Sequence, residues 1–135
     1  MWDSRAEADR WLRQAENDLA HARHSARGCY FSQTCFVAQQ VAEKAVKAMA
    51  YSLGDRTVLG HSVAALIDRY AERAPGLEKL RNAGALLDLY YIPTRYPNGL
   101  PGGYPFRSFT EEQAARAIEE AERFVAFANE VVNKD

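Results

Sequence analysis

The chain has 135 residues, of which 47% are apolar and 26% are charged. This balance is expected of a folded globular protein and excludes a long disordered chain. The apolar runs are only a few residues long, too short for a membrane-spanning helix. The formal net charge of -1 excludes a general attraction to nucleic acid, so any anion binding requires a local cluster of cations.

The length suits a single domain over residues 1–135, whose core needs neither disulfides nor a metal. The amino end, MWDSRAEADRW, is charged where a secretion signal would be apolar, so we expect a cytoplasmic protein without a membrane anchor. Cys29 and Cys35 lack the further ligands of a zinc site, and we interpret both as small core residues. His21 and His24 likewise lack a partner ligand. The sequence therefore predicts neither a metal nor a cofactor.

Apolar side chains recur at three- and four-residue spacing over residues 4–27, which predicts an amphipathic helix that ends at Gly28. A second helix is predicted over residues 30–53. Most of its circumference is apolar, so we expect it at the centre of a helical bundle. Its polar stripe consists of Gln40, Glu43, Lys44 and Lys47.

A third helix is predicted to begin at residue 61 or 62, and a fourth spans 77–92 before Pro93 ends it. The last helix opens with Thr110 and Gln113, which have the spacing of a capping box. No strand pattern is present. The sequence therefore predicts an all-α fold, an up-and-down antiparallel bundle of four long helices and one short helix.

The segment 93–109, between the last two predicted helices, combines prolines and glycines with aromatic residues and with Arg95 and Arg107. A loop of this length inside a compact domain is usually functional, and this one is too aromatic for a disordered linker. We expect it to be ordered and non-helical.

Two interpretations of these polar and aromatic residues remain open. In the first, arginines and lysines bind phosphate oxygens while tyrosines stack on bases. The candidate nucleotide-binding residues are then Gln40, Glu43, Lys44, Lys47, Tyr90, Tyr91, Arg95, Tyr96 and Arg107. In the second, Glu43 and Lys47 form an ordinary ion pair on a solvated face, and Arg95 ties a lid to helix carbonyls or to Glu43.

Four pieces, AENDLAHA, FVAQQVAEKAVKAM, GHSVAAL and YYIPTRYP, occur in an order and at a spacing that resemble the HEPN domain (higher eukaryotes and prokaryotes nucleotide-binding). The resemblance covers about residues 8–132. It implies a helical bundle that commonly forms homodimers. Members often act beside a minimal nucleotidyltransferase in two-component, toxin–antitoxin-like modules, and others are metal-independent ribonucleases or nucleotide-binding domains.

HEPN ribonucleases carry an arginine followed, after four to six residues, by a histidine, which suits phosphate binding and removal of the 2'-hydroxyl proton. The one such pair is Arg56 and His61, in a connection rather than on a late helix, and no histidine follows Arg95. His61 could equally cap a helix or pack beside an aromatic ring. We therefore expect a binder of nucleotide or RNA phosphate with a nucleotidyltransferase-type partner. The alternatives are a ribonuclease using Arg56 and His61, and a non-catalytic dimerisation module.

Overall fold

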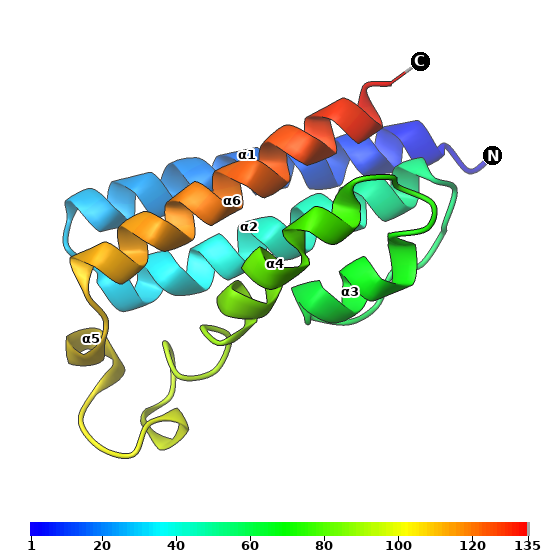
Figure 1. The fold of residues 1–135 in the computed structure, drawn as a ribbon. Helices are drawn as coiled ribbons and strands as arrows, with labels where there is room; N and C mark the ends of the chain where they lie inside the picture. Colours follow the sequence, from blue (N-terminus) through cyan, green and yellow to red (C-terminus); the bar gives the residue numbers. More distant parts are fainter. Residues whose placement is uncertain (135) are drawn as a thin grey trace.

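The computed structural model describes residues 1–134, and within them it contains helices and turns but no strand (Figure 1). The elements in chain order are α1 (Ser4–Arg27), α2 (Phe31–Ser52), α3 (Val63–Tyr70), the 3-10 turn η1 (Leu77–Leu80), α4 (Arg81–Asp88), the 3-10 turn η2 (Pro97–Gly99), α5 (Pro105–Ser108) and α6 (Glu111–Val132). The predicted all-α fold is confirmed. None of the described helices is both long and apolar enough to cross a membrane.

The three long helices α1, α2 and α6 pack side by side, with α1 antiparallel to the other two and both termini at one end of the bundle (Figure 1). The shorter α3 and α4 cover another side of α2. Nine apolar residues of α2 are fully buried, namely Cys35, Ala38, Val41, Ala42, Ala45, Val46, Ala48, Met49 and Ala50. Many of them are alanines, so neighbouring helices approach α2 closely. The predicted central position of this helix is confirmed.

Both ends of α1 and the start of α6 lie where the sequence predicts them. The Asp3 carboxylate accepts from the Ala6 backbone N–H at the start of α1, and the chain turns at Gly28. Thr110 and Gln113 form the predicted reciprocal capping box of α6. Because each cap satisfies backbone groups within a few residues, local sequence was sufficient to place these ends.

The fourth predicted helix is shorter than expected. Residues 77–80 form η1, α4 ends at Asp88, and residues 89–95 continue as turns. The bundle therefore has three long helices and two of eight residues each, rather than four long helices and one short. The segment 93–109 is ordered but not wholly non-helical, since Pro97 begins η2 and Pro105 begins α5. Proline suits a first helical position because its fixed φ matches a helix and its missing N–H would have no partner there.

Close contact between α3 and α4 depends on Gly84. A Cβ atom at this position would lie 2.8 Å from Cγ1 of Val63, so no other residue fits without movement. The contact brings the end of α4 to the start of α3, where Asp88 meets the first N–H groups of α3.

The two cysteines have different environments. Cys35 is fully buried, and burial raises the pKa of its thiol to about 12. Cys29 is exposed, with φ of 64° in the turn between α1 and α2, so the core interpretation of Cys29 was wrong. A turn that needs a left-handed residue directly after Gly28 places this side chain outside the core.

Candidate functional site

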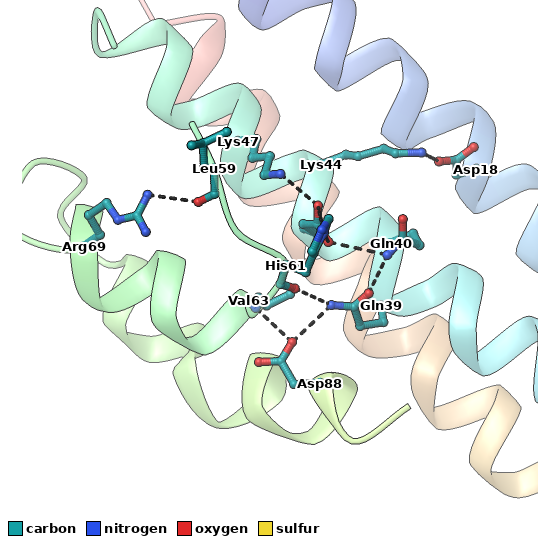
Figure 2. Close-up of polar contacts among 11 residues, drawn as sticks. Asp18, Gln39, Gln40, Lys44, Lys47, Leu59, His61, Val63, Arg69 and Asp88 are labelled. Atoms are coloured by element: carbon teal, nitrogen blue, oxygen red, sulfur yellow. Dashed lines mark hydrogen bonds and ion pairs between the residues drawn. The ribbon is translucent and has the colours of Figure 1, made fainter. Parts of the chain in front are cut away.

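An exposed imidazole stands over a buried ion pair on α2 (Figure 2). Nδ1 of His61 lies 3.3 Å from both carboxylate oxygens of Glu43, and Nζ of Lys47 lies 2.9 Å from Oε2 of the same group. The Glu43 and Lys47 side chains are only 6% and 7% exposed, whereas that of His61 is 63% exposed. A buried carboxylate thus orients a solvent-accessible histidine.

The backbone of His61 is fixed by a second set of contacts (Figure 2). Nε2 of Gln39 donates to the His61 carbonyl at 2.8 Å and to Oδ1 of Asp88 at 3.1 Å. Asp88 also accepts from the Ser62 hydroxyl and from the backbone N–H groups of residues 63 and 64. The same carboxylate therefore caps α3 and, through Gln39, positions His61.

His61 belongs to a cluster of rings and a guanidinium, which we name the Tyr91 cluster: Phe36, His61, Tyr91, Arg95 and Tyr96. The His61 and Tyr91 rings are stacked with centroids 5.3 Å apart. The Arg95 guanidinium carbon lies 4.3, 4.7 and 5.0 Å from the ring centres of Phe36, Tyr91 and Tyr96. Such contacts favour a planar, permanently charged guanidinium over a flexible amine.

The charge of Arg95 is not neutralised by the surrounding chain. Its Nε donates to the Tyr91 carbonyl at 2.8 Å, in the turns that follow α4, so the predicted tie runs to a turn carbonyl rather than to a helix carbonyl or to Glu43. Within residues 1–134, no carboxylate lies at ion-pair distance and no acceptor takes the hydrogens of its two Nη atoms. By contrast, the Arg81 fork binds both oxygens of Asp68. Arg95 thus presents a fixed and unoccupied fork of donors to solvent.

The two lysines of the α2 stripe do not join Arg95. Lys44 is ion-paired with Asp18 of α1 (Figure 2), and Lys47 lies between Glu43 and the Trp11 ring, 5.5 Å from the ring centre. The two lysines, predicted with Arg95 as candidate phosphate-binding residues, therefore lie apart from it with partners of their own. Instead, the predicted internal Glu43–Lys47 ion pair is confirmed, as an almost fully buried pair rather than one on a solvated face. Gln40 donates to Gln39 and Glu43 and so belongs to the network under His61.

The remaining candidate residues have separate environments. Tyr90 is buried and packs edge-on against Phe109, with ring centroids 5.8 Å apart, so its ring is not a surface on which a base can stack. The same burial raises the pKa of its phenol. Arg107 is exposed on α5, where the exposed rings of Tyr104 and Phe106 stack at 5.5 Å. Tyr91 and Tyr96 alone among the candidate tyrosines lie beside Arg95.

Arg56 and His61 make contacts with different parts of the chain. The Arg56 guanidinium carbon lies 5.6 Å from the centre of the Trp2 ring, at the start of the chain, whereas His61 contacts Glu43 and Tyr91. The cation that shares a ring with His61 is Arg95, since both lie within 5.3 Å of the Tyr91 ring centre.

The order and packing of the helices are shared with known proteins. Residues 8–131 match the HEPN domain family. The chain belongs to the HEPN domain family. The HEPN fold of this chain resembles that of TT1696 from Thermus thermophilus, with a TM-score of 0.87 and 38% identity over 92% of this chain and 97% of that one.

Two further solved structures are similar. ST0689, an archaeal HEPN homologue, is 32% identical over 93% of this chain and 97% of its own, with a TM-score of 0.77. A HEPN domain protein from Thermotoga maritima, TM0613, is 28% identical over 93% of this chain and 99% of its own, with a TM-score of 0.73. Among curated proteins, none matches the chain.

Three residues of this candidate site were missed in the sequence. Gln39 stands in the apolar arc of the central helix, and a polar residue there signals a buried partner. Phe36 and Asp88 gave no such signal, because an aromatic residue and a helix-end aspartate are ordinary. Their roles depend on Arg95 and on the start of α3, which are distant in sequence.

Proposed function

We propose that this HEPN protein binds a nucleotide or an RNA phosphate at the Tyr91 cluster. The observation that carries the proposal is the Arg95 guanidinium, held by a backbone carbonyl and three rings while its outer donors stay free. A phosphate accepts two parallel hydrogen bonds from such a fork, and the exposed Tyr96 ring offers a surface for a base. His61 adds an imidazole, stacked on the Tyr91 ring that Arg95 also contacts.

Replacement of Arg95 by alanine is expected to weaken binding of a fluorescein-labelled RNA oligonucleotide by about 10- to 100-fold, since a charged hydrogen-bonding group contributes about 1.5 to 3 kcal/mol. The slope of the logarithm of the binding constant against the logarithm of the salt concentration should become shallower, by about the amount that one phosphate contact contributes. Fluorescence anisotropy at several salt concentrations measures both quantities. Arg81→Ala is the matched control, because Arg81 is also exposed but is neutralised by Asp68. Equal affinity of the parent and Arg95→Ala proteins would exclude Arg95 as the anchor.

The partner in the proposal is a nucleotidyltransferase-type protein in a two-component, toxin–antitoxin-like module. Its support is the membership of the chain in the HEPN family. Co-expression with the nucleotidyltransferase of a neighbouring gene, followed by size-exclusion chromatography, tests the pairing. Separate elution of the two proteins at micromolar concentration would contradict it.

A homodimer is the second assembly we propose. Large apolar side chains are exposed at two places, after α4 (Leu89, 66% exposed, and Ile92) and at α5 (Phe106, 67% exposed, and Tyr104). Exposed apolar and aromatic side chains are typical of protein–protein interfaces. Sedimentation at micromolar concentration should give a species of twice 15.2 kDa, and Leu89→Glu with Phe106→Glu should give the monomer. A parent protein that sediments as a monomer would refute the dimer.

A second candidate function, metal-independent RNA cleavage, is favoured by the contact between His61 and Glu43. A carboxylate on Nδ1 fixes the ring and leaves Nε2 without a partner among residues 1–134, as a general base requires. The phosphate-binding cation in this version is Arg95 in place of Arg56, which lies on Trp2.

Incubation of the purified protein with RNA in EDTA tests the second function. If cleavage occurs, His61→Ala and Arg95→Ala should each abolish it, while Arg56→Ala should leave the rate unchanged. Loss of cleavage in Arg56→Ala with retained activity in Arg95→Ala would instead restore the Arg56 and His61 pair. A protein that binds RNA without cleaving it supports binding alone.

A further inference from the structure

A second concave surface lies at the turn between α1 and α2, outside the Tyr91 cluster. It is a hollow of about 500 Å³. Its lining consists of His21, His24, Ser25, Arg27, Gly28, Tyr30 and Gln33. The last two turns of α1, the connection that follows and the first turn of α2 supply these residues.

The residues that line the hollow include Arg27 and two histidines but no carboxylate. Within residues 1–134, the side chains of His21, His24 and Arg27 have no hydrogen-bond or ion-pair partner. Arg23, one turn from Arg27 on α1, is in contrast paired with Glu122 at 2.6 Å. No side chain caps the start of α2, so the first N–H groups of that helix add partial positive charge at the same place. The hollow therefore favours an anion.

Tyr30 gives the hollow a flat aromatic wall. Its side chain is among the exposed large rings, at 61% exposure. The ring lies against Gly28, where an added Cβ atom would come within 3.1 Å of the Tyr30 Cδ2 atom. The turn thus supports the ring while most of its surface stays open, which suits stacking by a base.

One face of α2 joins the hollow to the Tyr91 cluster. Gln33 lines the hollow, Phe36 contacts Arg95, and Gln40 belongs to the network under His61. These residues follow one another at three- and four-residue spacing, so they lie on one side of the helix. Gln33 and Gln40 are about 10 Å apart along the axis at roughly 1.5 Å per residue. This distance equals about three steps of a stacked nucleic-acid strand at roughly 3.4 Å each.

We infer that the hollow at the α1–α2 turn is a second subsite for a single-stranded oligonucleotide, which runs along α2 from the Tyr91 cluster. Arg27 and His24 bind a backbone phosphate of the strand, and a base stacks on Tyr30. The inference rests on the proposed function, because the Tyr91 cluster anchors the first phosphate. It adds that the ligand is a single strand of several nucleotides, rather than a mononucleotide or a duplex.

Anisotropy measurements with labelled di- and hexanucleotides of uridine test the inference. The parent should bind the hexanucleotide at least roughly tenfold more tightly than the dinucleotide, since a dinucleotide does not span both sites. Tyr30→Ala with Arg27→Ala should remove most of this difference and leave dinucleotide affinity unchanged. Tyr30→Phe should keep it, because the ring remains. Arg13→Ala is the control, an exposed α1 arginine paired with Asp9. Circular dichroism checks that each variant folds.

Each result bears on one of the two proposals. Equal affinity for the two ligands, or equal losses for both ligands in the Tyr30 and Arg27 variant, would overturn the second subsite while Arg95→Ala still tests the first. Hexanucleotide binding that depends on Tyr30 but not on Arg95 would support the hollow and overturn the proposed anchor. Binding of neither ligand would overturn both.

Discussion

Replacement of Glu43 by glutamine is expected to lower the free energy of unfolding by about 3 kcal/mol or more. Glutamine keeps the shape of the side chain but removes the negative charge that faces the Lys47 ammonium at 2.9 Å. Because Lys47 is only 7% exposed, water cannot replace that charge, and a neutral amide oxygen and the Trp11 ring are left to face the ammonium. Urea unfolding followed by circular dichroism measures the change, which corresponds to a fall in Tm of roughly 10 °C.

The matched control is the double variant Glu43→Gln with Lys47→Met. Removal of both charges leaves no uncompensated ion, and a neutral pair of similar volume is often as stable as the buried ion pair that it replaces. The double variant should therefore regain most of the lost stability. A single Glu43→Gln variant within about 0.5 kcal/mol of the parent would show that solvent reaches this pair, contrary to the structure.

Replacement of Asp88 by alanine is expected to lower the free energy of unfolding by about 2 to 4 kcal/mol. Its carboxylate accepts hydrogen bonds from Gln39, from the Ser62 hydroxyl and from the two N–H groups that open α3. Gln39 is fully buried, so its amide would lose a partner without gaining water. Chemical denaturation gives the loss, and amide hydrogen exchange should locate it at the start of α3.

The free energy of unfolding of Asp88→Asn should lie between those of Asp88→Ala and the parent, because the asparagine amide oxygen still accepts some of these hydrogen bonds. Asp68→Ala, which removes an exposed carboxylate of α3 that is paired with Arg81, should change stability little. The Asp88→Ala variant should also loosen His61, since Gln39 bonds both groups. If Asp88→Ala destabilises the protein but leaves the NMR signal of the His61 ring unchanged, Asp88 caps α3 without positioning His61.

These two variants bear on function because Glu43 and Asp88 hold His61 from different sides. Glu43 orients the imidazole directly, while Asp88 acts through Gln39 on the backbone carbonyl. Buried polar groups are costly unless they are fully bonded. Here such groups converge on one exposed ring beside Arg95. This preorganisation supports the proposal that the Tyr91 cluster, rather than the lysines of α2, receives the ligand.

The sequence predicted the helices most accurately where the signals are local. The apolar stripes, the Gly28 turn and the capping box of Thr110 and Gln113 each involve residues within one or two turns. The fourth helix was overestimated because Leu89 and Tyr90 continue a helical pattern although the chain leaves the helix at Asp88. Tyr90 instead packs on Phe109, a contact made across the bundle that no local pattern reports.

For the candidate site, the sequence singled out Arg95, Tyr91 and His61 but not their grouping. It placed Lys44 with Arg95, whereas Lys44 pairs with Asp18, a residue 26 positions away. It paired Arg56 with His61 by spacing, whereas Trp2 takes Arg56 and Tyr91 takes His61. In an irregular connection the number of residues between two side chains does not determine whether they point toward each other. The spacing of Arg56 and His61 therefore could not establish a contact between them.

The sequence by itself determined the all-α fold, the buried face of each long helix and the family, because helix periodicity and caps act over a few residues and burial follows from them. Only the tertiary structure decided which polar side chains meet. Gln39 and Asp88 are 49 positions apart, and their contact depends on how closely α4 docks on α3 and α2. A polar side chain has many partners within reach in a bundle, and the docking of the helices selects one of them.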